Sequence, residues 1–124
     1  MPVTLHTAHN INYVECHPTD FVIQNERDIM DLVALCGEYE ASNVIIYETN
    51  FSPDFFDLKT KFAGTLFQKF ANYHIRGAAI ISLTNINSER FKELIVECNR
   101  GNLFRFFEEK AAAEKWLTYA EGNR

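Results

Sequence analysis

The chain has 124 residues and a mass of 14.4 kDa, the size of one ordinary domain, so we expect a single domain over residues 1–124. Hydrophobic residues make up 47% and charged residues 23%, a balance that excludes disordered, collagen-like and coiled-coil proteins. The net charge of −5 disfavours binding to nucleic acid and to anionic membranes.

The sequence shows no signal for secretion, membrane insertion or cofactor chemistry. The first ten residues lack the basic flank and apolar segment of a signal peptide, so we expect a cytoplasmic protein. The longest uncharged apolar run, residues 77–83, is far shorter than the roughly 18 residues of a membrane helix. Cys16, Cys36 and Cys98 are irregularly spaced without a Cys-x-x-Cys pair, so we expect buried, reduced thiols and no metal or cofactor.

Two short runs at the start of the chain predict a β-hairpin. They cover residues 3–8 and 11–16, and His9-Asn10 between them suits a two-residue turn because Asn tolerates positive φ. Alternation places two sets of side chains on opposite faces, and we expect the first set to face the core. The first set is Val3, Leu5, Val14 and Cys16, and the second is Thr4, His6, Tyr13 and Glu15.

The hairpin region also holds the one candidate metal cluster of the sequence, His6, His9, Cys16 and His17. Because Cys16 and His6 fall on opposite faces and His9 lies in the turn, a tetrahedral site would break the predicted register. We therefore predict no metal site here.

Helices and strands alternate after the hairpin. The expected strands are two buried ones at Val44–Tyr47 and Ile75–Ser82, and a third at Leu103–Phe107. The expected helices are one capped by Asn25, one from Ser52-Pro53-Asp54 to about Tyr73, one from Ser88 to Gly101, and one at Glu108–Ala120. In the last helix we expect Ala112, Trp116 and Leu117 to point inward. The order β-β-α-β-α-β-α-β-α predicts an α/β domain with four helices and a mixed sheet of about five strands, in which the hairpin supplies the antiparallel member.

The segment 48–57 is the candidate functional site, because it follows the carboxyl end of a buried strand and precedes a helix, where open α/β sheets bind ligands. The glycine spacing of a phosphate loop and the Gly-x-Ser-x-Gly of a nucleophile elbow are both missing. His74 lies past the far end of the predicted helix, roughly 30 Å away, which excludes a dyad with Ser52. The candidate residues are Glu48, Thr49, Phe51, Ser52, Asp54, Phe55, Phe56 and Asp57.

Ser52 is expected to cap the helix that Pro53 and Asp54 begin. The nearest following cation is Lys59, so a phosphate on Ser52 would lack a close partner and would lie beside two carboxylates. We expect a structural role for Ser52.

The eleven Phe residues suggest a large aromatic core. Phe55 and Phe56 are neighbours that point about 100° apart on a helix, which leaves one of them for the surface. An exposed aromatic patch marks a partner surface or an apolar pocket. The same surplus of aromatic side chains suggests a homodimer formed through an apolar helical surface.

The stretches Tyr47–Thr60 and Leu66–Tyr73 resemble a small bacterial family catalogued as domain of unknown function 4180. The likeness covers nearly the whole chain, and its specific part is Pro-Asp-Phe-Phe-Asp-Leu-Lys-Thr at residues 53–60. That family has no established activity to carry over. The element order is also similar to STAS and SpoIIAA-like domains, regulatory modules with a phosphorylatable Ser or Thr, followed shortly by Gly, at a strand-to-helix junction; here Pro53 follows Ser52.

Together these features favour a non-enzymatic cytoplasmic regulatory or protein-interaction domain that acts through the surface around residues 51–57 on an unknown protein partner. The alternative is a protein that binds a small apolar ligand in an aromatic pocket. A hydrolytic enzyme using Glu48, Asp54 and Asp57 ranks third, because no base with an orienting partner can be named.

Overall fold

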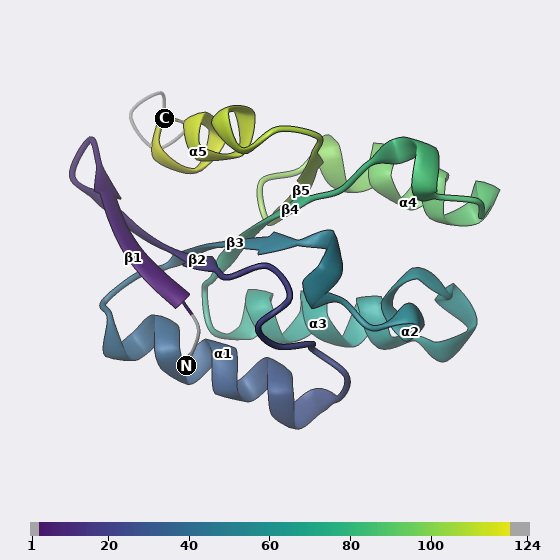
Figure 1. The fold of residues 1–124 in the computed structure, drawn as a ribbon, viewed down its shortest axis with the longest axis horizontal. Helices are drawn as coiled ribbons and strands as arrows, with labels where there is room; N and C mark the ends of the chain where they lie inside the picture. The colour runs from purple at the N-terminus through teal and green to yellow at the C-terminus, as the bar shows by residue number, and fades with distance from the viewer. Residues whose placement is uncertain (1–2, 120–124) are drawn as a thin grey trace.

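The computed structural model describes residues 3–119 and contains one five-stranded sheet of order β1-β2-β3-β4-β5 (Figure 1). β1 is antiparallel to β2, and β2 to β5 are parallel to one another, so the predicted mixed sheet is confirmed. The strands are β1 (Val3–Ala8), β2 (Ile11–Cys16), β3 (Asn43–Tyr47), β4 (Arg76–Ile80) and β5 (Phe104–Phe107).

Helices cover both faces of this sheet. α1 (Glu26–Glu38), the short α2 (Pro53–Phe56) and α3 (Phe62–Asn72) pack on one face, and α5 (Lys110–Tyr119) packs on the other (Figure 1). α4 (Glu89–Asn99) packs beside β5 and shares the larger core with α1 and α3. No helix in residues 3–119 is both long and apolar enough to cross a membrane.

The predicted hairpin is confirmed with its turn. His9 and Asn10 have φ values of 54° and 65°, which form the type I′ turn of a two-residue loop, and Ala8 pairs with Ile11. The prediction of one core face was wrong in two places. Leu5 is 41% exposed because it lies on the edge strand outside the core, and Tyr13 is fully buried under α5.

The two central strands are buried on both faces, as their unbroken apolar runs predict. In β4, Gly77 makes room for aromatic rings: a Cβ there would lie 2.6 Å from the Phe104 ring and 2.8 Å from the Phe70 ring. A smaller core beneath α5 consists of Tyr13, Ile45, Ala78, Ala113, Trp116 and Leu117.

The helix predicted from Ser52 to about Tyr73 is not continuous. α2 ends at Phe56, a 3₁₀ turn (η2, Leu58–Thr60) follows, and α3 begins at Phe62. Asp57 caps η2 by accepting a hydrogen bond from the Lys59 amide, and Lys61 has a φ of 65° that interrupts helical geometry. The domain therefore has five α-helices within residues 3–119 rather than the four predicted.

Two details of the last helix also differ from the prediction. Ala113 is buried in place of Ala112, which is exposed, while Trp116 and Leu117 point inward as expected. The predicted end at Ala120 lies outside the described residues. All three thiols are free, with Cys16 and Cys36 buried and Cys98 half-buried.

Candidate functional site at the carboxyl edge of the sheet

A hollow of about 390 Å³ lies at the carboxyl ends of the parallel strands. Open α/β sheets bind ligands at this edge, because loops from several strands converge there. The hollow is lined by Pro18, Tyr47, Glu48, Thr49, Ile80, Ile81, Ser82 and Glu108, which follow or end β2, β3, β4 and β5.

Glu48 links two of these loops. It begins the 3₁₀ turn η1 (Glu48–Asn50) directly after β3. Its Oε1 accepts a hydrogen bond from the Ser82 amide at 2.8 Å, and its Oε2 accepts one from the Asn85 side-chain amide at 2.9 Å. These two bonds fix the carboxylate at the wall of the hollow.

Glu108 reaches the same loop from the end of β5. Its Oε2 accepts a hydrogen bond from the Leu83 amide at 3.1 Å, one residue beyond the amide that Glu48 uses. Among residues 3–119, neither Glu48 nor Glu108 has an ion-pair partner. The hollow therefore carries two fixed carboxylates that no cation of the described residues neutralises.

An apolar pocket of about 170 Å³ adjoins the hollow and shares Ile81 and Glu108 with it. It lies where α4 packs against β5. Its lining is Ile81, Leu83, Ile95, Asn99, Phe106, Phe107 and Glu108.

On the α5 side, Tyr47 joins the hollow to a polar cluster around Glu15. The Glu15 carboxylate accepts from the Tyr47 hydroxyl, contacts His6 Nε2 at 2.8 Å and pairs with Lys110 Nζ at 3.0 Å. Burial alone would raise the pKa of Glu15, but the hydrogen bonds from Tyr47, Lys110 and His6 outweigh burial and hold the pKa below its ordinary value. Burial and the bond to Glu15 raise the pKa of Tyr47, so its phenol is neutral and remains a donor.

Asn50 connects two loops near the hollow, and no sequence pattern had predicted a role for this residue. Its fully buried side chain accepts from the Tyr47 amide and donates to the carbonyls of His17 and Phe21. These bonds join the end of β3 to the loop between β2 and α1, so Asn50 fixes the segment that carries Glu48 and Thr49.

Comparison with known families supports the resemblance seen in the sequence. A family model described as Domain of unknown function (DUF4180) matches residues 8–117. The chain belongs to this family. No curated protein and no solved structure matches the chain, so the likeness to STAS and SpoIIAA-like domains rests on element order alone.

The DUF4180 chain brings only part of its predicted site into the hollow. Glu48 and Thr49 line it. Phe51 and Phe55 are buried and stacked with ring centroids 4.0 Å apart, and Phe56 is half-buried against them. The remaining two carboxylates, Asp54 and Asp57, are exposed.

The helix-capping role predicted for Ser52 is wrong. Its Oγ makes no capping bond and is buried without a hydrogen-bond partner. The backbone explains this placement, because the Ser52 amide donates to the Ile23 carbonyl in a short parallel bridge between Ile23 and Phe51. That bridge draws Ser52 into the core.

The candidate metal ligands of the hairpin are dispersed. His6 contacts Glu15, His9 packs on Tyr119, Cys16 is buried in the core, and His17 lies beside Thr4 and Asp20. Within residues 3–119, no three side chains of the His, Cys, Asp and Glu types form a group that could hold a metal ion.

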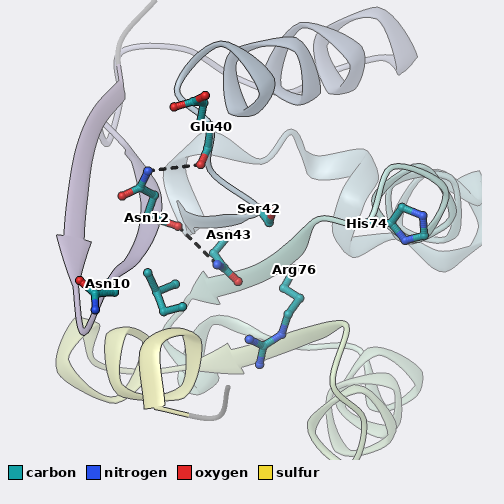
Figure 2. A pocket seen from close by; sticks show the side chains of 8 residues that line it. Asn10, Asn12, Glu40, Ser42, Asn43, His74 and Arg76 are labelled. Atoms are coloured by element: carbon teal, nitrogen blue, oxygen red, sulfur yellow. Dashed lines mark hydrogen bonds between the residues drawn. The ribbon is translucent and has the colours of Figure 1, made fainter. Parts of the chain in front are cut away.

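A second, polar hollow of about 370 Å³ lies at the opposite, amino edge of the sheet, and Figure 2 shows the side chains that line it. Asn43 lies within it, 5% exposed, and donates to the Asn12 carbonyl. His74 borders this hollow just before β4, so it lies at the other edge of the sheet from the segment after β3. The expected separation of His74 from Ser52 therefore holds. The lining is Asn10, Ile11, Asn12, Glu40, Ser42, Asn43, His74 and Arg76.

Proposed function

We propose that this DUF4180 domain is a non-catalytic cytoplasmic regulatory domain whose carboxyl-edge hollow binds a basic side chain of a partner protein. Two carboxylates support this function: Glu48 and Glu108 are fixed on adjacent amides of one loop, and no cation within residues 3–119 pairs with either of them. The three free thiols are consistent with a reducing compartment.

Electrostatics favour a cation in this position. Two like charges in one hollow repel each other, and an ammonium or guanidinium group between them replaces that repulsion by charge-assisted hydrogen bonds. Because backbone and side-chain amides already hold Glu48, little conformational entropy is lost when it binds.

The other walls suit the aliphatic part of a basic side chain. Pro18, Tyr47, Ile80 and Ile81 line the hollow beside the carboxylates. Lys and Arg bury their methylene stems against such surfaces while the charged end bonds to polar groups. The hollow thus matches both halves of a lysine or arginine side chain.

Only part of the predicted site lines the hollow. Glu48 and Thr49 remain proposed contact residues, and Asp54 and Asp57 add negative charge on the exposed surface after β3. Phe51, Phe55 and Ser52 are buried, so we give them a supporting role beneath the loop.

A second candidate function is binding of a small apolar ligand. The pocket of about 170 Å³ between α4 and β5 favours it, because Ile81, Leu83, Ile95, Phe106 and Phe107 supply an apolar lining. It differs from the expected aromatic pocket around Phe51 and Phe55.

An array of short peptides tests the proposal. Each peptide carries one Lys or Arg between apolar residues, and its matched control carries Gln instead. We expect the wild-type protein to bind the basic peptides. The double variant Glu48→Gln/Glu108→Gln should no longer bind them. The variant Glu38→Gln/Glu93→Gln makes the same charge change at exposed helical positions and should bind normally. Equal retention of Gln peptides, or unchanged binding by the first variant, would contradict the proposal.

A further inference from the structure

The two edge strands of the sheet differ in whether their outward backbone groups are hydrogen-bonded. At the β5 edge, the Asn99 side chain accepts from the Phe106 amide and donates to the Phe106 carbonyl, so it occupies the positions that another strand would use. At the β1 edge, no group in residues 3–119 bonds to the outward backbone of the strand. β1 also lacks the charges, proline and bulge that usually protect an edge strand.

The hairpin geometry identifies the unpaired groups of β1. In a two-residue hairpin, the pair next to the turn is hydrogen-bonded, and bonded and non-bonded pairs alternate from there. Because Ala8 pairs with Ile11, the residues bonded to β2 are Ala8, His6 and Thr4. The amides and carbonyls of Val3, Leu5 and Thr7 therefore point away from the sheet.

We propose that two copies of this chain pair through β1 in an antiparallel, two-fold symmetric dimer centred on Leu5. In this register Leu5 faces Leu5 of the second copy, and Val3 faces Thr7. All three outward residues then find partners, which gives about six backbone hydrogen bonds and one continuous ten-stranded sheet.

Other registers satisfy fewer groups. A dimer centred on Thr4 or His6 pairs only two of the three outward residues within the strand. In a register that sets odd-numbered residues opposite even-numbered ones, the outward backbone groups of one copy face residues of the other copy whose backbone groups already bond to β2. The Leu5-centred register is therefore the one that pairs all three outward residues.

Side chains support a second copy as the occupant. Leu5 is 41% exposed at the centre of the edge, and the dimer would bring two such side chains together. β1 contains no Asp, Glu, Lys or Arg, so its pairing brings no like charges together directly, although each chain carries a net charge of −5. This interface differs from the apolar helical surface expected from the sequence.

Light scattering of the full chain at increasing concentration tests the dimer. We expect a concentration-dependent dimer for the wild type and a folded monomer for Leu5→Lys, with unchanged circular dichroism. Val96→Lys, at a 51% exposed position on α4, is the matched control and should dimerise normally. A wild type that stays monomeric at high micromolar concentration, or a Leu5→Lys variant that stays dimeric, would overturn the proposal.

Oxidative cross-linking tests the register. Facing residues of a hydrogen-bonded pair have Cα atoms about 5.5 Å apart, within disulfide range, so Leu5→Cys should form covalent dimers well above the wild-type background. Thr7→Cys lies on the same edge, but its two copies would be more than about 10 Å apart and should not cross-link. Cross-linking at position 7, or none at position 5, would reject the Leu5-centred register.

Discussion

Ser52 has a buried hydroxyl group without a hydrogen-bond partner, which is an unfavourable feature in a folded protein. We expect Ser52→Ala to leave the free energy of unfolding unchanged or to raise it by up to about 1 kcal/mol, because alanine removes the unpaired group. Ser88→Ala is the control: Ser88 Oγ accepts from the Phe91 amide, so its loss should cost about 1 kcal/mol. Urea denaturation measures both, and a loss at Ser52 as large as that at Ser88 would show that Ser52 does form a stabilising bond.

Glu15 makes the stability of the fold depend on pH. Since its pKa is lower in the folded chain than the ordinary value of 4.5, its contribution is fully present above that value and disappears as the pH falls through the folded pKa. The stability difference between wild type and Glu15→Gln should therefore be largest near neutral pH and shrink in acid. Denaturation series from neutral to acid pH check this, and a difference that does not change with pH would show that the charge of Glu15 is not what stabilises the cluster.

Local sequence rules succeed for single residues when the groups they need are adjacent in the chain. Asn25 caps α1 as predicted, and Ser88, which was predicted to start a helix, caps α4, because each side chain accepts a hydrogen bond from the amide three residues later. Ser52 has the same sequence signal, but its backbone pairs with Ile23, some thirty residues away, and local rules do not include such a contact.

At the scale of elements, Trp116 anchors α5 to the sheet. The guanidinium groups of Arg76 and Arg105 lie 4.2 and 4.9 Å from the centroid of its ring, which is 8% exposed. Trp116→Ala should lower the free energy of unfolding by about 3 to 5 kcal/mol, through lost burial and cation–π contact. A denaturant titration that shows a loss below about 1 kcal/mol would mean that α5 contributes little to the fold.

Gly77 sets the distance between β4 and the aromatic rings of the larger core. Gly77→Ala should cost about 1 to 3 kcal/mol, because the added Cβ would overlap the rings of Phe104 and Phe70. Gly64→Ala in α3 is the matched control, since its Cβ would meet nothing within 4 Å and alanine favours helices by about 1 kcal/mol. Thermal unfolding should therefore shift in opposite directions for the two variants, and a stabilised Gly77→Ala variant would contradict this packing.

The order of strands and helices followed from hydrophobic patterns, but the break at residues 57–61 did not. The apolar stripe continues through α2, η2 and α3, with Phe55, Leu66 and Phe70 all in one core, so the pattern looks like one helix. The interruption depends on Asp57 as a cap and on the left-handed backbone of Lys61, and neither disturbs hydrophobic spacing.

For the whole molecule, the sequence predicted where the carboxyl-edge hollow lies but not most of the residues that line it. Glu48 and Thr49 were identified because they follow a buried strand. Ser82 and Glu108 follow other predicted strands, but their meeting depends on the order of strands in the sheet, which local patterns do not give. The burial of Tyr13 was missed for a similar reason, because α5 crosses to the other face of the sheet.

An NMR titration shows whether the carboxyl-edge hollow binds a basic group. The Ser82 and Leu83 amides donate to Glu48 and Glu108, so their signals report on these carboxylates. With Nα-acetyl-arginine methylamide as the probe, we predict saturable shifts of both signals that are absent with the uncharged norleucine analogue and are strongly reduced in Glu48→Gln/Glu108→Gln. Unchanged Ser82 and Leu83 signals up to the solubility limit of the probe, or equal shifts with both probes, would show that the hollow does not bind a basic group.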